Sequence, residues 1–209
     1  MSLERVIGIA RGELGYREDP PGSNRVKYGE AYGLNGVPWC VIFLWWLFRE
    51  AGESEAFFGG GKTASCTVLR RWYREQGRIV SPEEARAGDI VILNFSGTKE
   101  SQHCGLVTEG YSGGEVATIE GNTADAGGSQ DGGGMVCRKT RRPSQIVAVC
   151  RPQYSETKDD ATGHWAEEAV RRCVRRGLMK GYPDGSLRPD GSVTRGELAV
   201  ILERLEESK

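Results

Sequence analysis

Cys40 is the residue of this chain whose setting best suits nucleophilic chemistry. It follows Trp39 in the segment GVPWCVIFLWWLFREAG, residues 36–52, and precedes an apolar run that predicts a helix. If Pro38 and Trp39 lead into that helix, Cys40 lies in its first turn, where unpaired backbone N–H groups and the positive end of the helix dipole favour a thiolate. The same N–H groups could bind an oxyanion. The alternative interpretation is a small, buried, inert cysteine.

A thiolate nucleophile also requires a base, and the sequence contains two histidines. His164 belongs to the C-terminal part, whereas His103 opens a predicted strand in the same region as Cys40, so we predict His103 as the base. Its side chain shares a strand face with Gly105, whose missing side chain leaves space for a helix end to approach. The neighbouring Cys104 points to the opposite face, which argues against a second nucleophile there. The alternative for His103 is a solvated residue at a strand edge.

A third polar group must orient the imidazole, and the segment TIEGNT, residues 118–123, offers two candidates. Glu120 and Asn122 are two residues apart on a predicted strand, so both side chains leave the same face. Either could accept the second ring N–H of His103. The alternative is that they are ordinary polar residues at the end of a strand.

Elements of two kinds must bring these residues together. Helices come first in the sequence, and short β-rich segments separated by glycine-rich turns follow them, which predicts an α+β fold with an antiparallel sheet. The expected helices cover about residues 2–14, the segment from 40 to 51, and the segment TASCTVLRRWYREQGR (63–78). The expected strands cover residues 90–95, 103–109, 115–122, 135–139 and 145–151.

Composition excludes several classes of protein. The 28 basic and 29 acidic side chains of the 209-residue chain nearly cancel, so no global charge favours nucleic acid or an anionic membrane as partner. The longest apolar run is far too short to cross a bilayer, and the N-terminus carries charge in every turn, so we expect no signal peptide and synthesis in the cytoplasm. The six cysteines show no paired CxxC spacing, and most are expected to be buried thiols.

The C-terminal quarter of the chain has a separate pattern. Residues 153–162 are polar and predict a linker, after which we expect a small helical hairpin of about 45 residues at 163–209. Its second helix should begin with a capping box formed by Thr194 and Glu197.

Three quoted segments also carry a family resemblance. The WC pair at 39–40, QHCGLV at 102–107 and TIEGNT at 118–123 resemble the signature segments of the CHAP domain, a papain-like family of cysteine amidohydrolases and peptidases that cut bacterial peptidoglycan. The likeness covers about residues 3–152, so we expect a CHAP-like domain at 1–152. It implies Cys40 as nucleophile, His103 as general base, Glu120 as orienter of His103 and Asn122 as an assisting residue, with Trp39 contacting the substrate.

The resemblance also sets expectations about cofactors and origin. No cofactor is implied, and we expect no structural calcium because residues 19–39 contain only Asp19 and Glu30 as carboxylates. The implied reaction is hydrolysis of an amide bond of the wall peptide, by an N-acetylmuramoyl-L-alanine amidase or an endopeptidase, and residues 59–61 and 124–134 could line the substrate groove. A phage or prophage endolysin is the expected type. The alternatives are a host autolysin and a catalytically silent wall-binding or scaffold protein.

The C-terminal segment HWAEEAVRRCVRRGLMKGYPDGSLRPDGSVTRGELAVILERL resembles an S-layer homology (SLH) module. This resemblance implies attachment to a secondary cell-wall polysaccharide, with Arg195 at a helix N-terminus meeting a ligand carboxylate and Trp165 contacting the polymer. One copy is present where three commonly form a binding unit, which raises the possibility of a homo-oligomer. The expected site of action is therefore the bacterial cell wall, with peptidoglycan as the other partner. A hairpin that only packs on the catalytic domain is the alternative.

Overall fold

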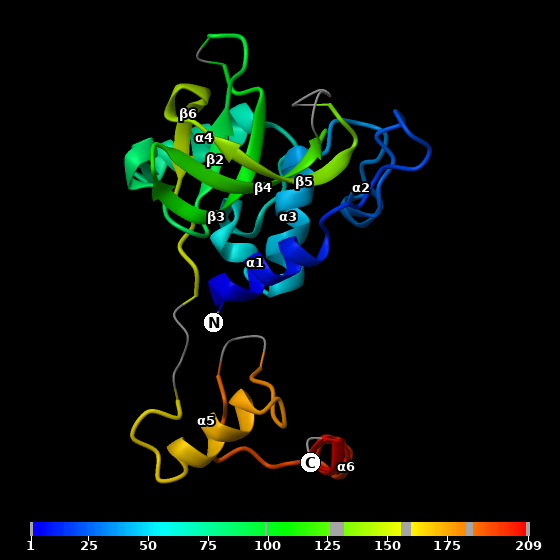
Figure 1. Ribbon diagram of the computed structural model, residues 1–209, viewed down its shortest axis with the longest axis vertical. Helices are drawn as coiled ribbons and strands as arrows, with labels where there is room; N and C mark the ends of the chain where they lie inside the picture. Colours follow the sequence, from blue (N-terminus) through cyan, green and yellow to red (C-terminus); the bar gives the residue numbers. More distant parts are fainter. Residues whose placement is uncertain (1, 99, 126–131, 156–159, 183–185, 208–209) are drawn as a thin grey trace. The chain divides into compact units, whose positions relative to one another are not determined.

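The structure, a computed structural model, describes residues 2–98, 100–125, 132–155, 160–182 and 186–207 (Figure 1). It divides into two compact units, an N-terminal unit from Leu3 to Tyr154 and a C-terminal unit from Ser155 to Lys209. The division falls inside the segment 153–162 that the sequence predicts as a linker. Each unit is described separately below.

A single antiparallel sheet forms the frame of the N-terminal unit. Its strands lie in the order β1-β6-β2-β3-β4-β5, so β3 and β4, which carry the predicted base and its orienter, are neighbours near the centre. The strands are β1 (Ile79–Val80), β2 (Ile90–Leu93), β3 (His103–Ser112), β4 (Glu115–Thr123), β5 (Met135–Arg141) and β6 (Ile146–Cys150). The five predicted strands are all present, and the short β1 is additional.

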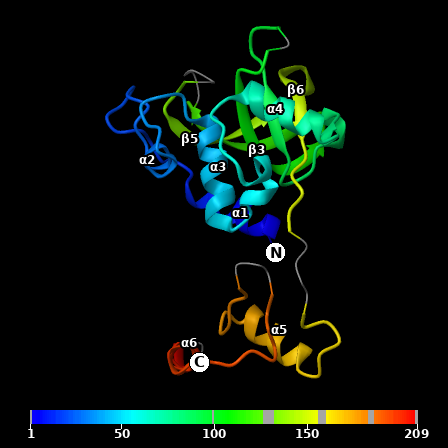
Figure 2. The same cartoon turned by 180° about the vertical axis from the view of Figure 1, so that it is seen from behind.

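Helices cover one face of this sheet, as the two opposite views show (Figures 1 and 2). In the N-terminal unit they are α1 (Ser2–Gly12), α2 (Lys27–Tyr32), α3 (Cys40–Ala51) and α4 (Cys66–Glu75). Short 3-10 turns occur at Ser54–Ala56, Phe58–Gly60, Pro82–Glu84 and Pro143–Gln145. Helices on an antiparallel sheet confirm the predicted α+β class.

Helix α3 is the centre of the main core. Most of its side chains are buried, including Phe43, Leu44 and Leu47, and they pack with residues of the other helices and with one face of the sheet. A helix that is apolar on nearly all sides must be surrounded by other elements on nearly all sides. This packing fixes the position in space of the first turn of α3. A smaller apolar cluster on the strands includes Val91, Leu93, Val107, Val116 and Val149.

Helix α2 was not expected from the sequence. It is only six residues long and follows the turn-rich segment after Asp19, so it lacks the long apolar period that identifies a helix. Its buried Tyr28 contacts the rings of Trp39 and Phe43. The short helix therefore supports the start of α3 through packing.

The C-terminal unit contains α5 (Glu167–Arg175) and α6 (Arg195–Glu207). The predicted capping box is present, because Thr194 Oγ1 accepts from Glu197 N at 3.2 Å and Glu197 Oε2 accepts from Thr194 N at 2.8 Å. Along both helices, the residues whose side chains the structure describes include none that is buried. Leu198 and Leu202 of α6 are 51% and 52% exposed. Among the described residues, no helix is long and apolar enough for a membrane span.

Candidate active site

Cys40 is the first residue of α3, as the sequence predicts. The first intrahelical bond of this end runs from Phe43 N to Trp39 O at 2.8 Å. The N–H groups of a first turn have no partner within the helix, so they are available to an anion near the Cys40 sulfur. The Cys40 side chain is 6% exposed and therefore lies at the edge of the core rather than on the open surface.

His103 and Glu120 face each other on the neighbouring strands β3 and β4. His103 Nε2 lies 3.2 Å from Glu120 Oε2, and both side chains are fully buried. Gly105 makes this approach possible, because a Cβ there would lie 2.5 Å from Cγ of Glu120. We expected the glycine to admit a helix end; the structure instead fills that space with the Glu120 side chain. In both the expected and the observed arrangement, the missing side chain of the glycine lets a neighbouring group approach the strand closely.

Arg141 on β5 holds Glu120 in place and was missed by the sequence analysis. Its Nε donates to Glu120 Oε1 at 2.8 Å and its Nη2 to Oε2 at 2.5 Å, a bidentate pair. Thr118 Oγ1 donates to Oε1 at 2.6 Å. The predicted strand ended at residue 139, so the pattern did not extend far enough to place Arg141 beside β4.

These contacts set the charges of the buried pair. Burial would raise the pKa of Glu120, but Arg141 and His103 lower it to about 2. Burial would lower the pKa of His103, but the side chains of Cys40 and Glu120 raise it to about 9. Opposite charges nearby outweigh desolvation at both residues, so at neutral pH the carboxylate and the imidazolium are both ionised.

Three cysteine sulfurs meet at the start of α3. Sγ of Cys40 lies 3.8 Å from Sγ of Cys66, and these two sulfurs and that of Cys104 all lie within 4.8 Å of one another. The thiols of Cys104 and Cys66, followed by the imidazole of His103, lower the pKa of Cys40 well below its ordinary value despite burial. The sequence analysis did not foresee that Cys104 lies beside Cys40. Strand alternation does place Cys104 and His103 on opposite faces, but Cys40 lies near the beginning of β3, within reach of both.

The nitrogens of the His103 ring are not fully hydrogen-bonded. Among the described residues, neither of its nitrogens has a hydrogen-bond partner of standard geometry. The Cys40 side chain is still close enough to the ring to raise its pKa. Catalytic hydrogen bonds are often long or poorly aligned before substrate binds, so the arrangement permits proton transfer between these two side chains.

Asn122 has an unusual backbone and an unsatisfied amide. Its φ is 59°, in the left-handed region that asparagine tolerates better than most residues. The side chain is buried, and within the described part of the chain neither Oδ1 nor Nδ2 has a hydrogen-bond partner. A buried amide without partners is costly, and strain at such a residue is typical of functional sites. Its side chain is thus available for a ligand.

Trp39 does not occupy the position expected of a substrate contact. Its side chain is fully buried and packs against Tyr28 and Phe43. A Cβ at Gly121 would lie 2.6 Å from the Trp39 ring, so the indole fits closely beneath β4. Burying a large apolar ring beside the start of a helix stabilises the folded state more than exposing it would. Trp39 therefore packs beneath the site and does not face the substrate.

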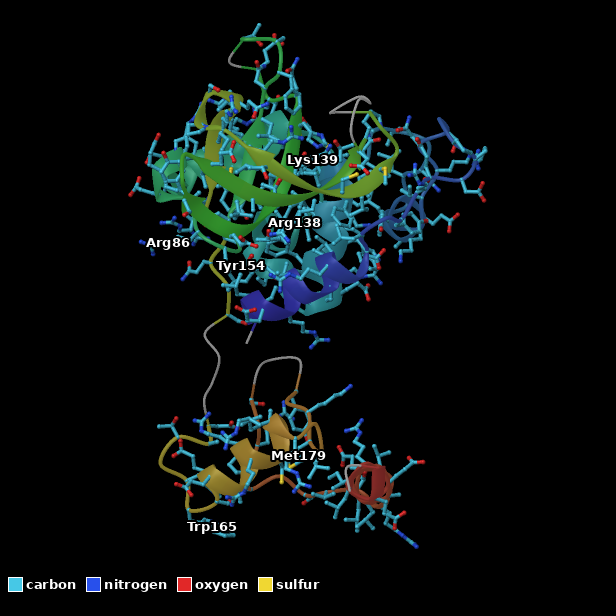
Figure 3. The ribbon with its side chains drawn as sticks, in the orientation of Figure 1. Arg86, Arg138, Lys139, Tyr154, Trp165 and Met179 are labelled. Atoms are coloured by element: carbon cyan, nitrogen blue, oxygen red, sulfur yellow. The ribbon has the colours of Figure 1, made fainter. Side chains whose placement is uncertain are left out.

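The two residues predicted to bind wall polymer lie in the C-terminal unit. Trp165 is 91% exposed, and its side chain points away from the rest of the unit (Figure 3). Arg195 is exposed and is the first residue of α6. A hollow of about 500 Å³ in the same unit is lined by residues that include Leu178, Tyr182 and Val200. Of the predicted groove loops, residues 126–131 lie outside the described part of the chain.

Models of two protein families match separate parts of the chain. The model of the CHAP domain matches residues 32–122, and that of the S-layer homology domain matches residues 159–199. The first match contains Cys40, His103, Glu120 and Asn122, and the second contains Trp165 and Arg195. Both resemblances inferred from the sequence are confirmed.

Curated relatives match over short stretches. Outer membrane protein SlpA of Deinococcus radiodurans is 40% identical over 72 residues, which are 34% of this chain and 6% of that protein. Cell surface glycoprotein 1 of Acetivibrio thermocellus is 44% identical over 48 residues, 23% of this chain and 2% of that protein. This chain therefore corresponds to a small part of each. A crystal structure of the wild type endolysin LysIME-EF1 aligns with a TM-score of 0.43 at 17% identity, covering 73% of this chain and 64% of that one.

Proposed function

We propose that this chain, in which a CHAP domain is followed by an S-layer homology domain, hydrolyses an amide bond of bacterial peptidoglycan with Cys40 as nucleophile. The observation that carries the proposal is the arrangement at the beginning of α3, where a thiol of lowered pKa adjoins a buried histidine that is held by a carboxylate. Apolar packing alone would not require ionised side chains here, because buried charges are costly and must be paired to be tolerated. Their presence therefore supports a catalytic site. We assign it to the phage or prophage endolysin type.

The reaction follows from the charges of the site. The Cys40 thiolate attacks the carbonyl carbon of the amide, the S–C bond forms, and the carbonyl electrons move onto oxygen. His103 donates its proton to the amine nitrogen as the C–N bond breaks, and the amine leaves. His103 then removes a proton from water, which attacks the thioester and releases the carboxylate and the Cys40 thiolate.

Two groups could stabilise the oxyanion. The N–H groups of the first turn of α3 carry the positive end of the helix dipole, and Asn122 offers an amide N–H₂ that lacks a partner among the described residues. One donor of this kind typically contributes about 3–4 kcal/mol to the transition state. Glu120 stays ionised beside Arg141 and keeps the imidazole oriented.

The C-terminal unit supports a role in attachment to the wall. Several matched relatives are named as surface proteins, including the S-layer protein of Bacillus licheniformis, which is 32% identical over 69 residues. Arg195 at the N-terminus of α6 could bind a carboxylate of a secondary wall polysaccharide with its guanidinium and the free helix N–H groups. The exposed Trp165 provides an apolar face for a sugar ring. We propose that the module keeps the enzyme at its substrate.

The test compares two cysteine variants on purified cell walls. We expect Cys40→Ala to abolish the release of soluble fragments while Cys150→Ala, a buried cysteine outside the sulfur cluster, retains it. Mass spectrometry of the new termini then distinguishes an amidase from an endopeptidase, because only the amidase leaves a free carboxyl on the lactyl group of muramic acid. Equal fragment release by wild type and Cys40→Ala would contradict the thiol mechanism. Wall binding without any release would favour the silent wall-binding protein.

A further inference from the structure

The proposed reaction uses one of the three sulfurs that meet at the beginning of α3. Cys40, Cys66 and Cys104 come from three different elements, two helices and a strand, yet their sulfurs lie within 4.8 Å of one another. Three other cysteines, Cys137, Cys150 and Cys173, lie outside this group. We call the first three the thiol cluster.

We propose that the thiol cluster is a binding site for one thiophilic cation of the zinc type. Soft thiolate ligands select such cations over hard ones. A zinc ion lies about 2.3 Å from each thiolate, and at tetrahedral angles this separates two ligating sulfurs by about 3.8 Å. The sulfurs of Cys40 and Cys66 are 3.8 Å apart, so this pair already has the spacing of ligands.

The third ligand requires only a small adjustment. Sγ of Cys104 lies no more than 4.8 Å from either of the other sulfurs, which is at most about 1 Å beyond the tetrahedral spacing. A change of side-chain rotation at one cysteine moves a sulfur by that amount. Three protein ligands leave a fourth position for water, which is the usual composition of an open zinc site.

The surrounding elements favour negative charge at the cluster. Cys40 is the first residue of the twelve-residue α3, and Cys66 is the first residue of the ten-residue α4. The positive ends of two helix dipoles therefore lie at Cys40 and Cys66 and offset part of the repulsion among thiolates. Burial and the neighbouring Cys40 raise the pKa of the Cys66 and Cys104 thiols, so the cation must displace their protons. Each thiol that ligates the cation releases its proton to water, so binding liberates protons.

Access is narrow but present. Cys40 and Cys66 are 6% and 7% exposed, whereas Cys104 is fully buried and forms the floor of the site. The two helix cysteines therefore form the more exposed side of the cluster. Because Cys40 is a ligand, a bound cation occupies the nucleophile; this inhibitory consequence rests on the proposed function, whereas the binding does not.

The test measures binding and wall lysis separately on the full chain. Metal-free protein, kept reduced by a phosphine, is titrated with Co²⁺, which gives a near-ultraviolet thiolate-to-metal absorption band, and Zn²⁺ is then used as a competitor. We expect one equivalent per chain, with affinity at least about a hundredfold weaker in Cys66→Ala and in Cys104→Ala. Cys150→Ala, an equally buried cysteine outside the cluster, should bind as wild type does.

Thermal unfolding confirms that each variant is folded, and having two ligand variants on different elements keeps the test valid if one fails to fold. Absence of the band in wild type, or an equal loss in Cys150→Ala, would overturn the metal site. For lysis, we expect stoichiometric Zn²⁺ to inhibit wild type at least about tenfold and a chelator to restore it. Lysis by chelated protein without the absorption band would refute the metal site and leave the hydrolase standing. The band without lysis would refute the hydrolase and leave the metal site standing.

Discussion

The two units of this chain place their functional residues in opposite environments. In the N-terminal unit, His103, Glu120 and Asn122 are buried residues of the sheet that packs against α3. In the C-terminal unit, Trp165 and Arg195 are exposed, and neither helix buries any of the side chains that the structure describes there. Chemistry requires charges fixed in a low-dielectric environment, whereas attachment to an extended polymer requires accessible groups. The difference predicts that equivalent substitutions have unequal effects in the two environments.

The largest effect is expected at the buried ion pair. Arg141→Met leaves the Glu120 carboxylate buried without its bidentate partner, which should cost about 3–5 kcal/mol in free energy of unfolding. It should also reduce wall lysis, because the carboxylate no longer holds His103. Chemical denaturation and lysis assays measure both effects.

The neighbouring Arg142→Met is the matched control. Arg142 pairs with Glu115 at 3.4 Å, and its side chain is 75% exposed. An exposed pair contributes only about 0–1 kcal/mol. Similar losses in the two variants would contradict the view that burial makes the Arg141 pair important.

The same substitution in two helices measures the difference in packing. Leu47→Ala removes a fully buried side chain of α3 and should cost about 2–5 kcal/mol of unfolding free energy. Leu202→Ala removes a half-exposed side chain of α6 and should cost below about 1 kcal/mol. Urea unfolding followed by tryptophan fluorescence is the measurement, and a loss at Leu202 as large as at Leu47 would show that α6 is packed.

Acid should destabilise the N-terminal unit through Glu120. Its pKa of about 2 lies below the unfolded value of about 4.3, so the pair stabilises the folded state above the unfolded pKa, and this contribution disappears as pH falls from about 5 to 2. The loss is roughly 2–3 kcal/mol. Urea unfolding across this range should give a smaller decline in Glu120→Gln. An identical decline in both proteins would assign the acid sensitivity to other carboxylates.

The smallest effect is expected at the capping box of α6. Thr194→Ala removes the oxygen that accepts from Glu197 N, so the first turn should open more often. Amide hydrogen exchange in that turn should become roughly three- to tenfold faster. Exchange in α3 should not change, and an effect there would contradict the separate behaviour of the two environments.

Local patterns predicted much of this molecule. The five strands alternate with turn residues clearly enough to be identified, and the capping box depends on residues three apart. The placement of Cys40 at the start of a helix followed from the apolar run after it. Each of these features is encoded within a few consecutive residues.

Features that depend on register or on contacts between distant elements were missed. The position of Arg141 beside Glu120 depends on the length and register of β5. The meeting of Cys66 with Cys40 depends on how α4 packs, and the burial of Trp39 depends on the close approach of Gly121. No periodicity within a single segment contains this information. The domain limits and the roles of the site residues remain predictions.

The most direct test of the central claim is to trap the acyl-enzyme. Wild type protein is mixed with cell-wall peptide fragments, quenched in acid within the first turnover, digested, and examined by mass spectrometry. The account predicts an acyl adduct on the peptide that contains Cys40, no adduct on Cys66 or Cys104, and loss of the adduct in His103→Ala, because His103 must protonate the leaving amine. Efficient hydrolysis without any adduct on Cys40 would contradict it.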